Sequence, residues 1–121
     1  MTAPSLGFFV KVLVLDRAAS AAFYEKLGFV RVGSDATFTH LRWEERGDLM
    51  LVSAPVGVRV EGKRGWGVLL SFTSQTELSV IAERAAELSA PADGPEVKPW
   101  HTRELVVTDP DGYRLNFVQP A

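Results

Sequence analysis

Residues 8–29 read FFVKVLVLDRAASAAFYEKLGF and carry the local signals for a strand followed by a helix. Phe8–Leu15 is rich in β-branched and aromatic residues, which favour strands. Asp16 stands where a helix N-cap belongs, before the alanine-rich segment Arg17–Leu27. Gly28 is placed to end that helix, because glycine readily adopts a positive φ. We therefore predict a strand at the start of this stretch and a helix over Arg17–Leu27.

Three short strands are expected after this helix, because turn residues divide the sequence into short segments rich in strand-forming residues. The predicted strands are Phe29–Val32, Thr37–Trp43 and Leu49–Ser53. The predicted turns between them are Gly33-Ser34-Asp35 and Arg46-Gly47-Asp48. Residues 6–54 are thus predicted to form a β-α-β-β-β module. Residues 55–65, which contain Pro55 and three glycines, are interpreted as a linker.

The same order of elements is predicted to recur in residues 66–119. Trp66–Thr73 is strand-like, and the following Ser74-Gln75-Thr76-Glu77 fits a capping box at the start of a helix that ends near Leu88. The apolar face of this helix is expected to hold Leu78, Ile81, Ala82, Ala85 and Leu88. Pro91 to Pro95 is expected to interrupt regular structure. The remaining predicted strands are a short one near Glu96–Lys98, then Glu104–Thr108 and Tyr113–Val118, the last two joined by an Asp-Pro-Asp-Gly turn.

The composition excludes several classes of protein. A chain of 121 residues can form one domain with a single core, and no apolar run approaches the roughly 20 residues of a membrane span. The net charge of -2 argues against nucleic-acid binding, and the lack of cysteine excludes disulfides and thiolate metal sites. The N-terminal residues lack the features of a signal peptide, so we expect a cytoplasmic protein that does not bind membranes.

Two segments resemble a known superfamily. Asp16 followed by Phe23–Phe29 (FYEKLGF), and Asp109–Phe117 (DPDGYRLNF), resemble the signature segments of the glyoxalase/bleomycin-resistance/extradiol dioxygenase superfamily, also called vicinal oxygen chelate proteins. Within it, Gly47–Leu51 (GDLML) and the nine-residue step from Trp100 to Asp109 are most similar to bleomycin-resistance proteins. Those proteins sequester an antibiotic without altering it. The resemblance, together with the internal repeat, covers nearly the whole chain.

The resemblance implies an α+β fold of two βαβββ modules, glyoxalase/bleomycin-resistance in type, with curved mixed sheets and helices on their outer faces. It places the modules in one domain over 1–121, at about 6–54 and 66–119. It also implies a homodimer with two equivalent grooves built by both chains.

Metal-dependent members of the superfamily place His, Glu or Gln on the inner faces of four strands. Aligned on the resemblance, the corresponding positions in this sequence are Phe9, Val52, Gly67 and Asn116. The first three have no side-chain donor, and one asparagine cannot assemble a divalent-cation site. We therefore expect neither a metal nor another cofactor.

Strand alternation divides the side chains between two faces, because residues two apart point the same way. The helix-packed face is predicted to hold Val10, Val12, Val14, Val68, Leu70, Phe72, Leu115 and Phe117. The opposite face is predicted to be an apolar and aromatic groove that suits a flat ligand. The candidate ligand-binding residues are Phe9, Lys11, Phe38, His40, Arg42, Met50, Val52, Trp66, Trp100, Glu104, Arg114 and Asn116.

Trp100 and Phe38 are the first candidates for stacking on a ligand. Ordinary packing, or burial at a subunit interface, is the alternative role for Trp43, Trp66 and Trp100.

These residues favour a metal-free protein that binds and sequesters a small planar molecule such as an antibiotic, rather than an enzyme. A metal-independent isomerase, lyase or hydrolase, with His40, His101 or Glu104 as acid or base, is the alternative. A metal-dependent dioxygenase, glyoxalase or thiol transferase would require three of the four metal positions to be misaligned.

Overall fold

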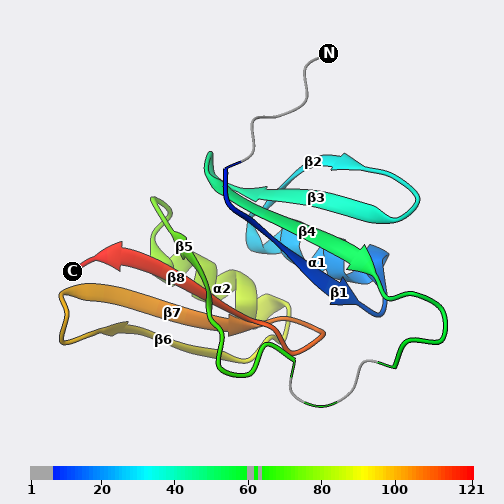
Figure 1. Cartoon of the computed structure of the whole chain (residues 1–121). Coiled ribbons are helices and arrows are strands. Elements are labelled where there is room, and N and C mark those ends of the chain that lie inside the picture. The colour runs from blue at the N-terminus through cyan, green and yellow to red at the C-terminus, as the bar shows by residue number, and fades with distance from the viewer. Residues whose placement is uncertain (1–6, 60–61, 63) are drawn as a thin grey trace. The chain divides into compact units, whose positions relative to one another are not determined.

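The structure, a computed structural model, describes residues 7–59, 62 and 64–121. The chain divides into two compact units, Met1–Arg59 and Val60–Ala121, which we call unit 1 and unit 2 and describe separately (Figure 1). The N-terminal segment used to infer localisation, the predicted module start at residue 6 and part of the predicted linker lie outside the described residues.

Unit 1 contains one helix and a mixed four-stranded sheet. Its elements are β1 (Phe9–Val14), α1 (Arg17–Leu27), β2 (Val30–Ser34), β3 (Phe38–Trp43) and β4 (Gly47–Ser53). The strand order is β1-β4-β3-β2, with β1 parallel to β4 and the other pairs antiparallel. Since α1 packs on β3 and β4, it covers one face of this sheet.

The predicted helix of unit 1 is confirmed at both ends. An Asp16 carboxylate oxygen accepts a hydrogen bond from the backbone amide of Ala19 at 3.0 Å, so Asp16 is the N-cap. Gly28 ends the helix with φ 129°, and its amide donates to the carbonyls of Tyr24 and Glu25. These contacts satisfy backbone groups that a helix end would otherwise leave without partners.

The FYEKLGF segment supplies the aromatic part of the unit 1 core. The Tyr24 ring lies edge-on to Phe23 and to Phe29, with centroids 5.5 and 5.1 Å apart. Phe29 in turn contacts Trp43 of β3 at 5.2 Å. All four side chains are buried, so this segment anchors α1 to the sheet by burying large apolar area.

Both turns predicted in unit 1 are displaced toward the neighbouring residues. Gly33 and Ser34 belong to β2, because the Asp35 carboxylate accepts hydrogen bonds from Thr37 and from the Phe38 amide and so fixes the turn after Ser34. Gly47 and Asp48 belong to β4, where they pair with β3. The predictions of turns at these four positions were therefore wrong, since strand pairing takes precedence over the turn preference of Gly, Ser and Asp.

Unit 2 repeats the order of elements found in unit 1. It contains β5 (Leu70–Thr73), α2 (Leu78–Glu87), β6 (Ala92–Val97), β7 (Thr102–Thr108) and β8 (Arg114–Pro120). The strand order is β5-β8-β7-β6, with β5 parallel to β8 and the other pairs antiparallel. The predicted fold class, two βαβββ modules with mixed sheets, is confirmed.

The first strand of unit 2 is shorter than predicted. β5 begins at Leu70, whereas Trp66 lies in a turn in which Gly65 and Gly67 have φ of 65° and 83°. A positive φ is incompatible with an extended strand, so pairing with β8 starts only at Leu70. Val68 is exposed, and its predicted place in the core was wrong.

The predicted capping box at the start of α2 was also wrong. Glu77 is the N-cap and makes no side-chain capping bond, while the Ser74 hydroxyl donates to the carbonyl of Thr76 at 2.7 Å. The Gln119 side-chain amide in β8 donates to the carbonyls of Ser74 and Thr76. These long-range hydrogen bonds hold residues 74–76 as a loop, so the helix starts four residues after Ser74.

Regular structure continues through the proline-rich segment, contrary to the prediction. β6 spans Ala92–Val97 at the edge of its sheet, where proline is tolerated because one side of the strand has no pairing partner. The register shifts between Asp93 and Glu96, around Gly94. Gly94 has φ 108°, and a Cβ there would lie 2.6 Å from the carbonyl oxygen of Glu104, so only glycine fits.

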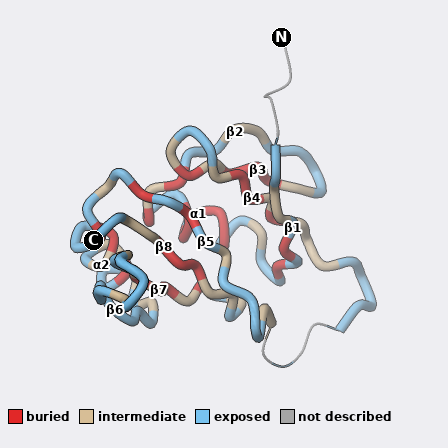
Figure 2. The backbone as a smooth tube through the Cα atoms, turned by 60° about the vertical axis from the view of Figure 1, so that its left-hand side comes forward, coloured by how far each residue is buried: buried red, intermediate tan, exposed pale blue. Residues whose placement is uncertain are grey.

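The buried residues of each unit follow its strands and the inner side of its helix (Figure 2). In unit 2 the core is built from α2 and from β5, β7 and β8, with Leu78, Ile81, Leu105, Leu115 and Phe117 fully buried. Among the described residues, no helix has the length and apolar character needed to span a bilayer.

Candidate functional site

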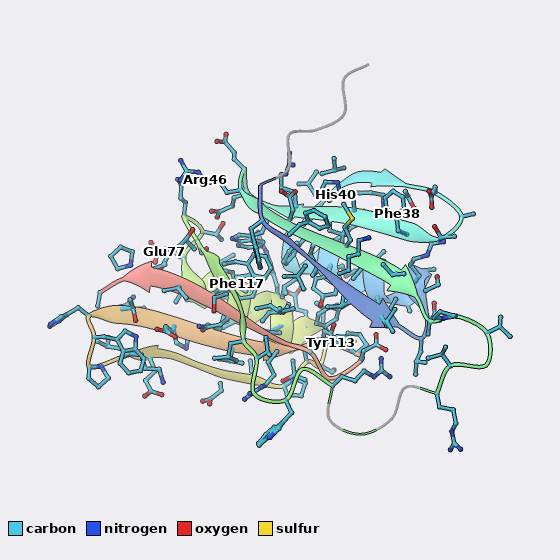
Figure 3. All side chains as sticks on the ribbon, viewed as in Figure 1. Phe38, His40, Arg46, Glu77, Tyr113 and Phe117 are labelled. Atoms are coloured by element: carbon cyan, nitrogen blue, oxygen red, sulfur yellow. The ribbon has the colours of Figure 1, made fainter. Side chains whose placement is uncertain are left out.

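The face of the unit 1 sheet that is turned away from α1, here called far face 1, carries all seven candidate residues from the first module. The register pairs Phe9 with Asp48, and Met50 with both Lys11 and His40. Because cross-strand partners point to the same side, these side chains share one face. From β1, β3 and β4, far face 1 includes Phe9, Lys11, Leu13, Phe38, His40, Arg42, Asp48, Met50 and Val52. Figure 3 labels Phe38 and His40, which lie two residues apart on β3.

His40, Arg42 and Asp48 form a charged cluster on far face 1. One oxygen of Asp48 lies 2.7 Å from His40 Nε2 and 2.7 Å from Arg42 Nε. His40 and Asp48 are buried, and the Arg42 side chain is 22% exposed. Burial raises the pKa of Asp48, but the hydrogen bonds from Arg42 and His40 outweigh it and hold that pKa below its ordinary value of 3.8.

The ionised state of Asp48 fixes the form of His40. A carboxylate can only accept hydrogen bonds, so Nε2 of His40 carries a proton and donates it to Asp48. When the ring is neutral, Nδ1 is the basic nitrogen. This arrangement orients an imidazole in the way that general-base catalysis requires, although Arg42 shares the same carboxylate oxygen.

The corresponding face of unit 2, far face 2, carries a polar network centred on Glu104. One carboxylate oxygen accepts from the Trp100 indole at 2.8 Å and from the Thr102 hydroxyl at 2.6 Å. The other accepts from the Asn116 amide at 2.9 Å, and that amide also donates to Ser71 at 3.3 Å. Hydrogen bonds from Thr102, Trp100 and Asn116 lower the pKa of Glu104 below 4.5, so it is ionised at neutral pH.

The Asn116 side chain leaves one acceptor unused within the described residues. Its amide nitrogen must face Glu104, because a carboxylate can only accept. Its carbonyl oxygen is buried and has no hydrogen-bond partner there. This oxygen therefore lacks the partner that buried polar groups normally have.

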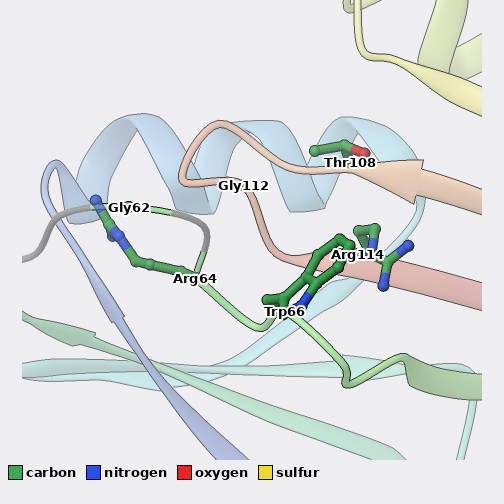
Figure 4. A pocket seen from close by; sticks show the side chains of 6 residues that line it. All are labelled: Gly62, Arg64, Trp66, Thr108, Gly112 and Arg114. Atoms are coloured by element: carbon green, nitrogen blue, oxygen red, sulfur yellow. The ribbon is translucent and has the colours of Figure 1, made fainter.

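A hollow of about 350 Å³ lies beside this face in unit 2 (Figure 4). It is lined by Gly62, Arg64, Trp66, Thr108, Gly112 and Arg114. The Arg114 guanidinium lies 5.7 Å from the centre of the Trp66 ring, and Arg64 forms an ion pair with Asp111 at 2.8 Å. The volume is within the range of sites that bind small molecules.

The twelve candidate residues thus fall into three groups. Far face 1 holds Phe9, Lys11, Phe38, His40, Arg42, Met50 and Val52. The Glu104 network joins Trp100, Glu104 and Asn116, and the hollow brings Trp66 and Arg114 together. His101, named as an alternative acid or base, is exposed just before β7 and makes no side-chain bond to either network that the structure describes.

The sequence prediction missed several residues that complete these groups. Asp48 was placed in a turn, yet it is the carboxylate that pairs with His40 and Arg42. Gly62, Arg64, Thr108 and Gly112 line the hollow but carried no sequence signal for a site. An aspartate six residues after an arginine and eight after a histidine, across a tight turn, was the one available hint.

The metal-ligand positions do not fit a divalent cation. Phe9 and Val52 lie on far face 1 without donor atoms, and Gly67 lies in a turn and not on the strand where it was predicted. Asn116 has one carbonyl oxygen to offer. Within the described part of the chain, no three His, Asp or Glu side chains are grouped as a metal site would require.

Solved structures share this fold. A bleomycin-binding protein in complex with bleomycin is 21% identical, covers 98% of this chain and 100% of its own, and superposes with a TM-score of 0.74. A glyoxalase/bleomycin resistance protein/dioxygenase domain from Frankia sp. is 22% identical with a TM-score of 0.76, covering 98% and 100%. An antibiotic-binding protein from a Streptomyces species is 22% identical with a TM-score of 0.69, covering 100% of both chains. No protein-family model matches the chain, and no curated protein sequence matches it significantly.

Proposed function

We propose that this chain is a metal-free small-molecule binding protein that sequesters a planar ligand, in the manner of an antibiotic-binding protein. The observation that carries the proposal is the hollow of about 350 Å³ walled by the Trp66 ring and the Arg114 guanidinium. Proteins of the same fold that bind bleomycin or another antibiotic support it, at 21% and 22% identity.

Two exposed indole rings support the binding of a flat molecule. The Trp66 and Trp100 residues are 71% and 63% exposed, although tryptophan is usually well buried. The Trp100 ring is held by its hydrogen bond to Glu104, and Asn116 holds Glu104 from the other side. A ring fixed in this way loses little conformational freedom when a ligand stacks on it, which favours affinity.

We further propose that each of the three groups offers ligand contacts of its own. Far face 1 contributes apolar surface through Phe9, Phe38, Met50 and Val52, with Lys11, His40 and Arg42 as polar groups. Unit 2 contributes Trp66, Trp100, Glu104, Arg114 and Asn116. Stacking and desolvation would provide the affinity, and the polar groups would set the orientation of the ligand.

A homodimer with equivalent binding sites, acting in the cytoplasm, is part of this proposal. Exposed apolar side chains such as Leu13, Val30 and Leu69 support burial against a second copy. Light scattering at several protein concentrations measures the oligomeric state, and metal analysis of the purified protein tests for a bound ion. A stoichiometric transition metal would contradict the metal-free proposal.

Titration of the purified protein with bleomycin, mitomycin C and a quinoxaline peptide antibiotic tests the function. We expect at least one of these to bind, and Trp100→Ala to weaken that binding about tenfold because a stacking ring is lost. Trp100→Phe, which keeps a ring but loses the hydrogen bond to Glu104, should weaken binding less than Trp100→Ala does. Calorimetry gives Kd, and mass spectrometry of the released ligand should show it unchanged. Absence of binding by every compound, or equal binding by Trp100→Ala, would count against the proposal.

A second candidate function, metal-independent acid–base catalysis, is favoured by the 2.7 Å contact between His40 and Asp48. It makes a different prediction in the same experiment. A bound compound would then be converted to a product, and His40→Gln would abolish the conversion without preventing binding. Recovery of unchanged ligand after long incubation would exclude this second function for that compound.

A further inference from the structure

We propose that the hollow of unit 2 recognises an acidic group attached to an aromatic ring, such as an aryl carboxylate. This inference rests on the proposed ligand-binding function and defines the chemical class of the ligand. It follows from the interaction partners of the two arginines in the hollow and from the empty space beside these arginines.

The two arginines differ in their partners. Arg64 is largely buried and donates to Asp111 at 2.8 Å, so its charge is balanced. The Arg114 guanidinium lies over the Trp66 ring, and this side chain makes no hydrogen bond or ion pair with any residue that the structure describes. A guanidinium stacked on an indole keeps its donors at its edge, where they can bind the two oxygens of a carboxylate.

The surroundings of Arg114 leave room for such a group. Thr108 lies opposite Arg114 in the β7–β8 register and lines the hollow with it, adding a hydroxyl that can donate to an anion. A Cβ added to Gly62 or to Gly112 would meet nothing within 4 Å, so the walls at these positions are open. The opposite charges of Arg64 and Asp111 balance each other. The charge of Arg114 therefore makes the hollow positive overall.

The charge decides which planar ligands the hollow should prefer. An anionic ring compound can stack on the exposed surface of Trp66 while its acidic group meets Arg114 (Figure 4). A cationic compound of the same shape would place like charge against the guanidinium. The preference should therefore run from acid to alcohol to amine.

A matched series of naphthalene probes tests this order. We expect 1-naphthylacetate to bind about tenfold more tightly than 2-(1-naphthyl)ethanol, since a charge-assisted hydrogen bond is gained, and 2-(1-naphthyl)ethylamine to bind most weakly. Kd is measured by calorimetry at low ionic strength and again in high salt, where the advantage of the acid should shrink. Equal affinity for the three probes, or preference for the amine, would overturn the inference.

Variants test whether Arg114 is responsible for the preference for the acid. Arg114→Gln should remove the roughly tenfold advantage of the acid over the alcohol, whereas Arg114→Lys should keep part of it. Arg103→Gln is the matched control, because Arg103 is an exposed arginine of β7 that does not line the hollow. An acid preference that survives in Arg114→Gln would place recognition elsewhere and refute the inference.

A measurement on the unaltered protein covers the case in which Arg114→Gln does not fold. In a ¹H–¹⁵N spectrum, 1-naphthylacetate should shift the indole N–H signal of Trp66 and leave that of buried Trp43 in place. An unchanged Trp66 signal at saturation would refute the inference. If an antibiotic binds but no naphthalene probe does, this inference fails and the proposed function stands. If neither series binds, both fail.

Discussion

Replacing Asp48 by alanine is expected to lower the free energy of unfolding by about 3 kcal/mol. The change would leave His40 buried without its acceptor and Arg42 without its carboxylate, at positions where both now lie 2.7 Å from one Asp48 oxygen. Removing one member of a buried charged cluster is costly because the remaining groups stay desolvated. Arg42 is 22% exposed and can partly rehydrate, which puts the expected loss at the lower end of the usual range.

Urea unfolding followed by tryptophan fluorescence measures this loss, since Trp43 is buried in the same unit. Glu25→Ala is the matched control, because Glu25 pairs with Arg31 at 2.7 Å on an exposed surface, where an ion pair contributes at most about 0.5 kcal/mol. If the two variants lose similar stability, the charged cluster would not be the stabilising element inferred here.

The acid sensitivity of the protein provides an independent check on Asp48. The pKa of Asp48 is lower in the folded protein than its ordinary value of 3.8, so its ionised form stabilises the fold above that pH. This contribution is lost as the pH falls through the lowered folded pKa. The stability of the wild type should therefore fall more steeply than that of Asp48→Ala as the pH drops below about 4. Parallel curves would contradict this assignment.

Replacing Arg17 by methionine should lower the free energy of unfolding by about 2 kcal/mol, even though methionine retains the apolar stem. The Arg17 guanidinium donates to hydroxyl groups at the ends of three strands, those of Ser34, Thr39 and Ser53. It also donates to the carbonyls of Asp35 and Ala36 in the β2–β3 turn. One side chain thus connects the first turn of α1 to β2, β3 and β4.

The planar fork of the guanidinium is required for this connection, because its donors point in several fixed directions. Arg17→Lys should therefore recover less than half of the loss. Arg31→Met, which removes an exposed arginine with a single partner, is the control and should cost at most about 0.5 kcal/mol. Full recovery by lysine in thermal or urea unfolding would show that charge alone, and not the fork, is responsible.

The sequence predicted the candidate site residues only on regular strands, where alternation decides which face of the sheet a side chain occupies. The alternation in β1, β3 and β4 separates Phe9, Phe38 and Met50 from Val12 and Val14, which were predicted on the helix-packed face and are buried. The period of two is a local property, so it survives errors of one or two residues at strand ends. It does not say which side chains on one face form bonds with each other.

In unit 2, local sequence patterns gave two wrong predictions of secondary structure, and both have the same cause. The capping-box pattern beginning at Ser74 was overridden by hydrogen bonds from Gln119, which is 45 residues later in the chain. The segment around Gly94 and Pro95 reads as a break, but pairing with β7 holds it in a strand. In each case a partner distant in sequence supplied the deciding interaction.

The sequence by itself determined the order of elements, the Asp16 cap and the Gly28 end of α1, and the division of the unit 1 strands into two faces. These features depend on neighbouring residues, on backbone preferences and on hydrophobic period. Only the tertiary structure decided that Asp48 meets His40 and Arg42, that Asn116 meets Glu104, and that Arg114 lies over Trp66. Such contacts depend on cross-strand register and on the path of a glycine-rich turn, and shifting either by one residue would separate the groups.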